Sequence, residues 1–340
     1  PHLFSSAASD VYKRQGNWDV SSGTDFRDMF SLALNFNQDI GNWDVSKALS
    51  FNEMFYKASA FNQDIGDWDV SNRERYDYMF SEAASFNQDL SSWNINENAS
   101  LNSMFIGADR MQSNHGVGDT PSIYYFNSYV FTDRSTLQTA IDAWIEDPNT
   151  AKETYGEIND WDVSEISDFS SLFEDKTTFN SDISNWNVSN GTDFSHMFNG
   201  ATVFQQNISS WDVSKGTDFE SMFKRTEWFN SDISNWDVSN GTDFSGMFAE
   251  SSFDHPDISN WNVSNGTSFS DMFSRNKYFN EDISSWDVSS GTNFSSMFFE
   301  VKNFNQDISS WDVSNGTYFS GMFDHSSKFN QDISSWDVSN

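Results

Sequence analysis

The stretch Trp286–Ser310 reads W-D-V-S-S-G-T-N-F-S-S-M-F-F-E-V-K-N-F-N-Q-D-I-S-S, and close copies of it fill most of the 340-residue chain. Its tryptophan returns every 25 residues in two runs, first Trp18, Trp43, Trp68 and Trp93, then Trp161, Trp186, Trp211, Trp236, Trp261, Trp286, Trp311 and Trp336. A fixed period of about 20–50 residues is typical of a repeat architecture, in which each repeat is one structural unit. The sequence therefore predicts a stack of 25-residue coils.

Each repeat carries two apolar patterns. The segment Ile283–Val288 is rich in strand-forming residues and predicts one short strand. After a turn, often Asn-Gly, a threonine provides an N-cap for a helix over Phe194–Ala201, whose apolar residues fall at i, i+3, i+4 and i+7. The few large apolar side chains of one repeat do not offset the entropy of ordering it, so each coil needs neighbours. We expect an α/β repeat solenoid with one short strand and one short helix per coil.

Charge and composition argue against several classes of function. The formal net charge is −33, and the chain has no cysteine. Phosphate binding requires clustered Lys and Arg, an anionic membrane repels an acidic protein, and thiolate metal sites require cysteine. No apolar run approaches the roughly 20 residues of a membrane span. We expect no nucleic-acid partner and no small-molecule cofactor.

The repeats divide the chain into segments. Residues 1–15 resemble, through D-V-Y-K-R-Q, the translation of a transposase-type sequencing adapter and are expected to be an artefact. The distance from Trp93 to Trp161 is not a multiple of 25, so a connecting segment separates two arrays. An amphipathic pattern over Ser135–Glu146, ended by Pro148, predicts a helix that caps the second array. The expected segments are 1–15, a first array of four coils at 16–111, a connector at 112–134, the capping helix and lead-in at 135–158, and a second array of eight coils, the last truncated, at 159–340.

The motifs W-D-V-S-N-G-T-D-F-S-G-M-F and F-N-Q-D-I-S-S resemble the BspA-like leucine-rich-repeat surface proteins, a group first linked with mycoplasma lipoproteins. The resemblance runs from Gly16 to Asn340, and Phe131–Phe173 is similar to the segment that opens such arrays. It implies a right-handed leucine-rich-repeat-like solenoid, an extracellular or cell-surface location, and a role in adhesion or protein–protein interaction without catalytic residues. A signal peptide and an anchor are expected to lie outside this fragment.

The chain departs from that family in one feature. The family usually has Val-Thr-x-Met after the strand, whereas this chain has Gly-Thr-x-Phe, as at Gly216–Phe219. The larger Phe is expected to fill the volume of the missing Val side chain.

Two polar columns admit two interpretations. The residue after each tryptophan is Asp in most repeats and Asn in three, and the residue before the strand isoleucine is Asp in most repeats and Asn207 in one. Tolerance of Asn indicates that a side-chain oxygen is needed more than a charge, which favours Asx turns. The alternative is a calcium ladder, because stacked carboxylates repel unless a cation separates them. Asn-x-Ser/Thr sequons, such as those at Asn190 and Asn240, fall mostly in the same turn columns, so turn chemistry explains them without glycans.

Nothing in the sequence indicates catalysis, because the histidines share no metal spacing and the carboxylates fall in repeated columns. The loop before the returning Phe of each repeat varies freely and holds basic and aromatic residues, which favour interfaces. Stacked loops would form one ridge, while neutral variation of a solvated loop is the alternative. The expected partner-binding residues are Arg225, Trp228, Arg275, Lys277, Tyr278 and Lys302.

The sequence thus favours a non-catalytic cell-surface or secreted repeat protein that mediates adhesion or protein–protein interaction. Its partner is expected to be a protein or glycan on another cell or in a matrix. The alternatives are a calcium-dependent structural or matrix protein and a glycan-binding module whose exposed aromatic side chains stack on sugars.

Overall fold

The computed structural model describes residues 15–71, 74–96, 98–115, 117–252 and 257–339. Apart from Gln15, the segment predicted to be adapter-derived lies outside these residues. The helical elements are η1 (Gln15–Asn17), α2 (Asp109–His115), η2 (Ile123–Tyr125), α3 (Arg134–Glu146), α4 (Pro148–Tyr155) and η3 (Ile158–Asp160). Parallel pairing within the described residues is confined to single bridges, such as Asp193 with Asp218.

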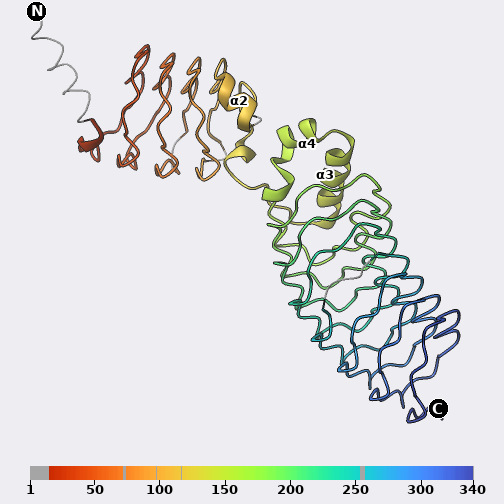
Figure 1. Cartoon of the computed structure of the whole chain (residues 1–340). Helices are drawn as coiled ribbons and strands as arrows, with labels where there is room; N and C mark the ends of the chain where they lie inside the picture. The colour runs from red at the N-terminus through yellow and green to blue at the C-terminus, as the bar shows by residue number, and fades with distance from the viewer. Residues whose placement is uncertain (1–14, 72–73, 97, 116, 253–256, 340) are drawn as a thin grey trace, which may run out of the picture. The chain divides into compact units, whose positions relative to one another are not determined.

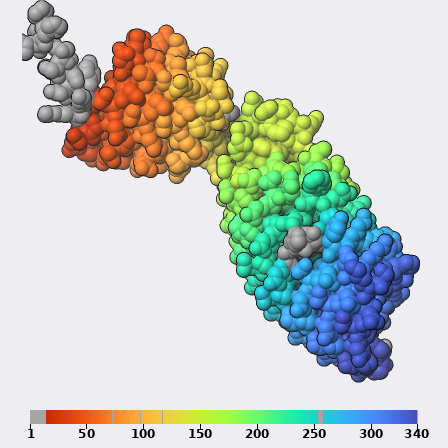
Figure 2. All heavy atoms as spheres, viewed as in Figure 1, coloured from red at the N-terminus to blue at the C-terminus, as the bar shows by residue number. Residues whose placement is uncertain are grey.

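The chain divides into two compact units. The first holds the described residues up to Tyr129 together with Glu153–Gly156, and the second holds Val130–Lys152 and the residues from Glu157 onward. Within the second unit, successive repeats follow one another as similar loops from green to blue (Figure 1). The space-filling view shows these repeats packed directly against their neighbours as adjoining bands (Figure 2).

Rings at equivalent positions of successive repeats form buried ladders. We number each repeat 1 to 25 from its tryptophan, so that the phenylalanines at positions 9, 13 and 19 follow. Trp43 and Trp68 stack with ring centroids 6.4 Å apart, and Phe219 and Phe244 stack at 5.7 Å. Almost all of these rings are buried, and Trp236 is 4 % exposed. The tandem stacking of aromatic rings inside the array is confirmed.

The strand predicted over the Ile-x-x-Trp-x-Val segment is wrong for the described repeats. The segment turns instead, because the Trp236 backbone N–H donates to the Ile233 carbonyl three residues earlier at 3.1 Å. The link between repeats is made by a side chain: the Trp236 indole N–H donates to the carbonyl of Ile208, 28 residues earlier, at 3.2 Å. At this segment, a turn within each repeat and an indole hydrogen bond between repeats therefore take the place of backbone pairing between strands.

The helix predicted over Phe194–Ala201 is also wrong. An α-helix would bond each N–H to the carbonyl four residues earlier. Here the amides at positions 9, 11, 13 and 15 donate to the following repeat, as when Phe194 N–H donates to Asp218 and Phe198 N–H donates to Met222, both at 2.9 Å. Positions 11 and 15 have positive φ, for example 56° at His196, which breaks the helical run. The apolar side chains still face inward, as their spacing indicated.

The threonine at position 7 joins repeats rather than capping a helix. Both the backbone N–H and the hydroxyl of Thr217 donate to the Thr192 carbonyl, at 2.8 and 3.1 Å. The same pair of bonds recurs from repeat to repeat through Thr317. Each repeat is thus tied to the one before it by a threonine column.

The turn glycine at position 6 leaves room for the ring at position 9. Gly241 has no positive φ, so its backbone does not require glycine. A Cβ added there would lie 2.4 Å from Cζ of Phe244, well inside van der Waals contact. The Phe244 ring fills the space beside Gly241, as the predicted exchange of volume requires, but Ile166 and Phe169 are both buried in one repeat, so the exchange does not hold for every repeat.

The helix predicted at 135–146 is present as α3, which begins one residue earlier. Asp133 caps it by accepting the Thr136 N–H at 2.9 Å. On the first repeat of the second unit, the Trp144 indole N–H donates to the Ser181 hydroxyl at 2.9 Å. Pro148 does more than follow the helix end, because it opens a second helix, α4, and proline is well tolerated at a first helical position.

Gln15 occupies the column that isoleucine or leucine fills in the other described repeats. Its carbonyl accepts the Trp43 indole N–H at 2.9 Å, as Ile40 does for Trp68. Its side chain is buried, and its Oε1 has no hydrogen-bond partner among the described residues. An unsatisfied buried amide is unfavourable where an aliphatic side chain fits.

Candidate functional site

The two Asp/Asn columns, at positions 2 and 22, form Asx turns. Asp237 Oδ1 accepts the Ser239 N–H at 3.0 Å, and Asp232 Oδ1 accepts the Ser234 N–H at 3.0 Å. Asn187 accepts in the same way as an aspartate. Among the described residues, no group of three or more His, Asp or Glu side chains is placed to hold a metal ion. The capping interpretation of these columns is confirmed.

These bonds make part of the stability depend on pH. Hydrogen bonds from the Ser214 hydroxyl and amide lower the pKa of Asp212 below its ordinary 3.8, and those from Ser314 lower the pKa of Asp312. A carboxyl group with a depressed folded-state pKa contributes stability above pH 3.8 and loses it as the pH falls through the lower folded value. We expect the melting temperature of the double variant Asp212→Asn, Asp312→Asn to fall less than that of the wild type when the pH is lowered from 7 to 3.

Asp218 provides a control, because its pKa is shifted in the opposite direction. Burial is the largest cause that raises its pKa, and Asp193 and Asp243 in the same column add to it. Its ionised form therefore costs stability at pH 7, so Asp218→Asn is expected to raise the melting temperature there. An equal acid sensitivity of all three proteins in thermal unfolding would contradict this assignment.

The asparagines of the turn sequons use their amide nitrogens within the fold. Asn190 Nδ2 donates to the Ser164 carbonyl at 2.6 Å, and Asn240 Nδ2 donates to the Ser214 carbonyl at 2.7 Å. A glycan would replace one of the two N–H groups on this nitrogen and leave the other to make the bond. The role of these asparagines in the turn column does not require a glycan.

Basic residues are concentrated in one strip of the second array. Of its eight Lys and Arg residues, seven fall at positions 14 to 18, whereas the other twenty positions hold one Lys and 22 of the 28 Asp and Glu residues. We call positions 14 to 18 of these repeats the ridge. Backbone bonds join them across repeats, since Arg225 N–H donates to Ala249 and Glu250 N–H donates to Ser274. The ridge is nearly neutral on an otherwise strongly acidic array.

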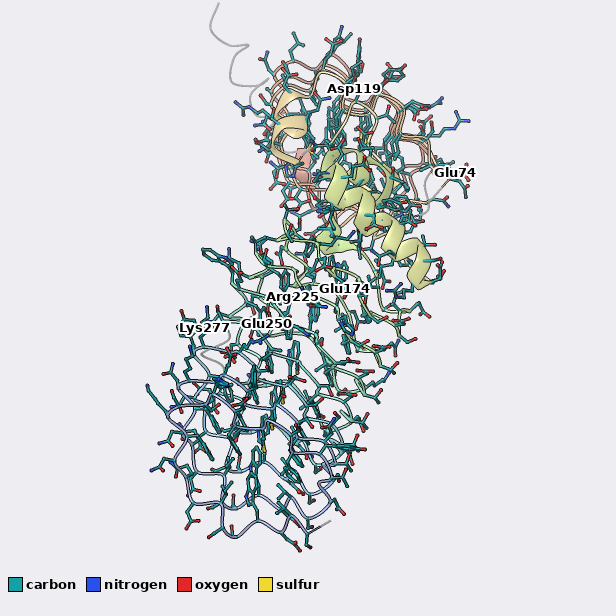
Figure 3. The ribbon with its side chains drawn as sticks, turned by 90° about the vertical axis from the view of Figure 1, so that its right-hand side faces the viewer. Glu74, Asp119, Glu174, Arg225, Glu250 and Lys277 are labelled. Atoms are coloured by element: carbon teal, nitrogen blue, oxygen red, sulfur yellow. The ribbon has the colours of Figure 1, made fainter. Side chains whose placement is uncertain are left out.

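The two predicted arginines of the ridge belong to a ladder of alternating charge at position 15. Arg275 lies between Glu250 and Glu300, at 3.9 and 3.7 Å, and Arg225 lies 3.5 Å from Asp175. Arg225 reaches back two repeats because Gly200 between them has no side chain. Figure 3 labels Arg225, Glu250 and Lys277 from successive repeats. The guanidinium groups are therefore engaged by acidic neighbours within the fold.

Arg225 also closes a polar network beside the ladder. Its guanidinium donates to Asn199 Oδ1 at 3.1 Å, and Asn199 Nδ2 donates to Glu174 Oε1 at 2.9 Å. His196 lies between Glu174 and Glu220, at 3.7 and 3.8 Å. These contacts hold the guanidinium group in place, although 47 % of the Arg225 side chain stays exposed.

The predicted aromatic residues stand out at position 18. Trp228 is 62 % exposed and Tyr278 is 54 % exposed, two repeats apart in the same column. Asn276 holds the backbone beneath Tyr278: it is fully buried, and its Oδ1 accepts the N–H groups of Tyr278 and Phe279 at 3.2 and 3.1 Å. Sequence reasoning missed Asn276, because its role depends on burial at a position that is Lys, Ala, Thr, Ser or Val in the other repeats of this array.

The predicted lysines lie beside these rings at position 17. Lys277 and Lys302 are exposed, and neither forms an ion pair with a described residue. Further along position 18, Lys328 donates to Asn303 Oδ1 at 2.8 Å. The six predicted residues therefore separate into two internally paired arginines and an outer edge of aromatic rings and lysines.

The sequence matches the family described as "Mycoplasma protein of unknown function, DUF285" over residues 2–118, 147–256 and 242–340. The chain belongs to this family. No curated protein and no solved structure matches it.

The three DUF285 matches cover both Trp-bearing runs, which agrees with the tandem repeats. Within the described part of this DUF285 chain, no helix has the length and apolar character needed to cross a bilayer. The geometry of the DUF285 repeats thus presents one chemically distinct surface, the ridge, on a regular acidic stack.

Proposed function

We propose that the chain is a non-catalytic adhesion protein of the cell surface or extracellular space, built as a right-handed leucine-rich-repeat-like solenoid of the BspA type. The observation that carries the proposal is the concentration of basic residues in the ridge of an acidic array, together with two exposed rings, Trp228 and Tyr278, at one position of that ridge. Charge segregation of this kind has no part in burying a core, whereas it suits recognition of a partner.

The regular stack supports this role because it holds the ridge in a fixed shape. Repeats contact their neighbours through rings, threonine bonds and backbone bonds, so side chains at one position form a continuous row. Exposed Trp and Tyr side chains on a rigid support lose little conformational entropy on binding, which favours them as anchors.

The repeated carboxylates support a non-catalytic role. A catalytic acid and base occupy different environments with separated pKa values. In this array the aspartates of positions 2 and 22 make the same Asx bond in one repeat after another. Their chemistry is accounted for by capping.

The proposal is tested with beads that carry the whole chain and settle on cultured cells or on a film of extracellular matrix. We expect wild-type beads to attach and beads with Trp228→Ala and Tyr278→Ala to attach at least about tenfold less, since aromatic anchors dominate interfaces. The matched control is Lys215→Ala with Tyr318→Ala, which removes an exposed cation and an exposed ring outside the ridge. Full attachment of the ridge variant would overturn the proposal.

A further inference from the structure

We infer that the outer edge of the ridge, formed by the described residues at positions 17 and 18 of the second array, binds a polysaccharide that carries carboxylate groups. The inference rests on the proposed function and names the ligand class of the same surface. It is carried by three observations: the positive charge of the edge, its exposed aromatic rings, and the hydrogen bonds that the backbone beneath it already makes.

The outer edge has the opposite sign of charge from the rest of the array. It holds Lys277, Lys302 and Lys328 against a single acid, Glu227. Lys277 and Lys302 are exposed and have no acidic partner among the described residues, unlike the arginines of position 15. At physiological salt the field of distant carboxylates is screened within about 8 Å, so two unpaired ammonium groups at this edge favour an anionic group in direct contact with them.

The exposed rings suit sugars in particular. Trp228 and Tyr278 occupy position 18 of repeats two apart, and buried rings in neighbouring columns of this array step by 5.7 to 6.0 Å per repeat. A pyranose ring has one face of C–H groups that packs on a flat aromatic ring, whose face is negative. Rings repeated along a column match a ligand that is itself a repeating polymer.

The backbone of the ridge disfavours an extended peptide. Strand addition requires free N–H and C=O groups along an edge. At position 15, beneath the edge, these groups bond between repeats, as Arg225 N–H does to Ala249 and Arg275 N–H to Phe299. At the edge itself, Tyr278 N–H donates to the Asn276 side chain and the Lys277 carbonyl accepts the Asn303 amide. An extended peptide therefore finds no continuous row of free backbone groups here, whereas the exposed rings and lysines suit stacking and ion pairing with a charged sugar chain.

The test uses calorimetric titration of the whole chain with oligogalacturonate and with its methyl ester, which has the same sugar backbone without the charge. Oligoguluronate and hyaluronate extend the carboxylated class, and polyglutamate represents an acidic peptide. We expect a carboxylated glycan to bind, its neutral counterpart to bind about tenfold more weakly, and the affinity to fall with added salt.

Two variants separate charge from stacking. Lys277→Gln with Lys302→Gln is expected to weaken binding of the acidic glycan about fivefold to tenfold and to reduce its salt dependence, while Lys215→Gln changes neither. Trp228→Ala with Tyr278→Ala is expected to weaken both the acidic and the neutral oligomer by about tenfold. Preserved circular dichroism and melting temperature would show that each variant is folded.

The outcomes distinguish this inference from the function on which it rests. Absence of binding by every carboxylated glycan, equal binding of polyglutamate, or unchanged affinity in the lysine variant would overturn the ligand class. If bead attachment still depends on Trp228 and Tyr278 in those cases, the adhesive role stands with another ligand. If attachment is also independent of them, both proposals fail.

Discussion

Replacement of Trp236 by alanine is expected to destabilise the second unit by about 3–5 kcal/mol, the usual cost of truncating a buried aromatic side chain. The indole is 4 % exposed, and its ring centroid lies 6.1 Å from that of Phe223. Its N–H also donates to the Ile208 carbonyl, which accepts the Trp211 backbone N–H as well. Alanine leaves a cavity and removes one of the two hydrogen bonds to this carbonyl. Denaturant unfolding of the whole chain, followed by circular dichroism, measures the loss.

Two companion variants separate the contributions. Trp236→Phe retains a ring but removes the N–H, so it is expected to cost less than alanine, with about 0.5–1.5 kcal/mol from the lost hydrogen bond, since the Ile208 carbonyl keeps its bond from the Trp211 N–H. Trp336→Ala removes the same side chain from the last described repeat, where the ring is only partly buried and stacks on Trp311 alone among the tryptophans. Equal destabilisation by Trp236→Ala and Trp336→Ala would show that interior rings do not support their neighbours.

The period and the inward-facing residues were predictable because both depend on side-chain chemistry repeated within the sequence. The local conformation was not. The apolar spacing of Phe194–Ala201 is the same for a helix and for the turns observed, and the difference lies in hydrogen bonds to residues 24 positions away. One signal was present: glycine recurs at the positive-φ positions 15 and 11, as at Gly107, Gly200, Gly246 and Gly321.

In the candidate site, too, some features were predictable from the sequence and others were not. Exposed rings and lysines were predictable from the variable loop alone, since exposure there needs no long-range information. Pairing of Arg225 and Arg275 was missed because their partners lie 25 or 50 residues away in the chain. The alternation of Arg225, Glu250, Arg275 and Glu300 in one column was nevertheless readable in the sequence. Opposite charges in adjacent repeats favour pairing, whereas like charges repel.

The exchange of volume between positions 6 and 9 gives the second large expected effect. Gly241→Val places a branched side chain where a Cβ alone would lie 2.4 Å from the Phe244 ring, so overpacking is expected to cost about 1–3 kcal/mol or more. Phe244→Met alone leaves a small gap, and its cost is expected to be below that of Gly241→Val. The double variant creates Val-Thr-x-Met, in which a smaller residue at position 9 makes room for the valine, and is expected to recover at least half of the loss.

A double-mutant cycle in denaturant measures this coupling directly, because residues in contact show interaction energies of about 0.5–3 kcal/mol. Gly118→Val is the matched control, since a Cβ at Gly118 meets only the Thr120 carbonyl oxygen at 3.6 Å and is expected to cost little. Additive effects of Gly241→Val and Phe244→Met would contradict the packing argument. In that case the glycine at position 6 would serve the backbone of the turn, and the Phe at position 9 would be an independent substitution.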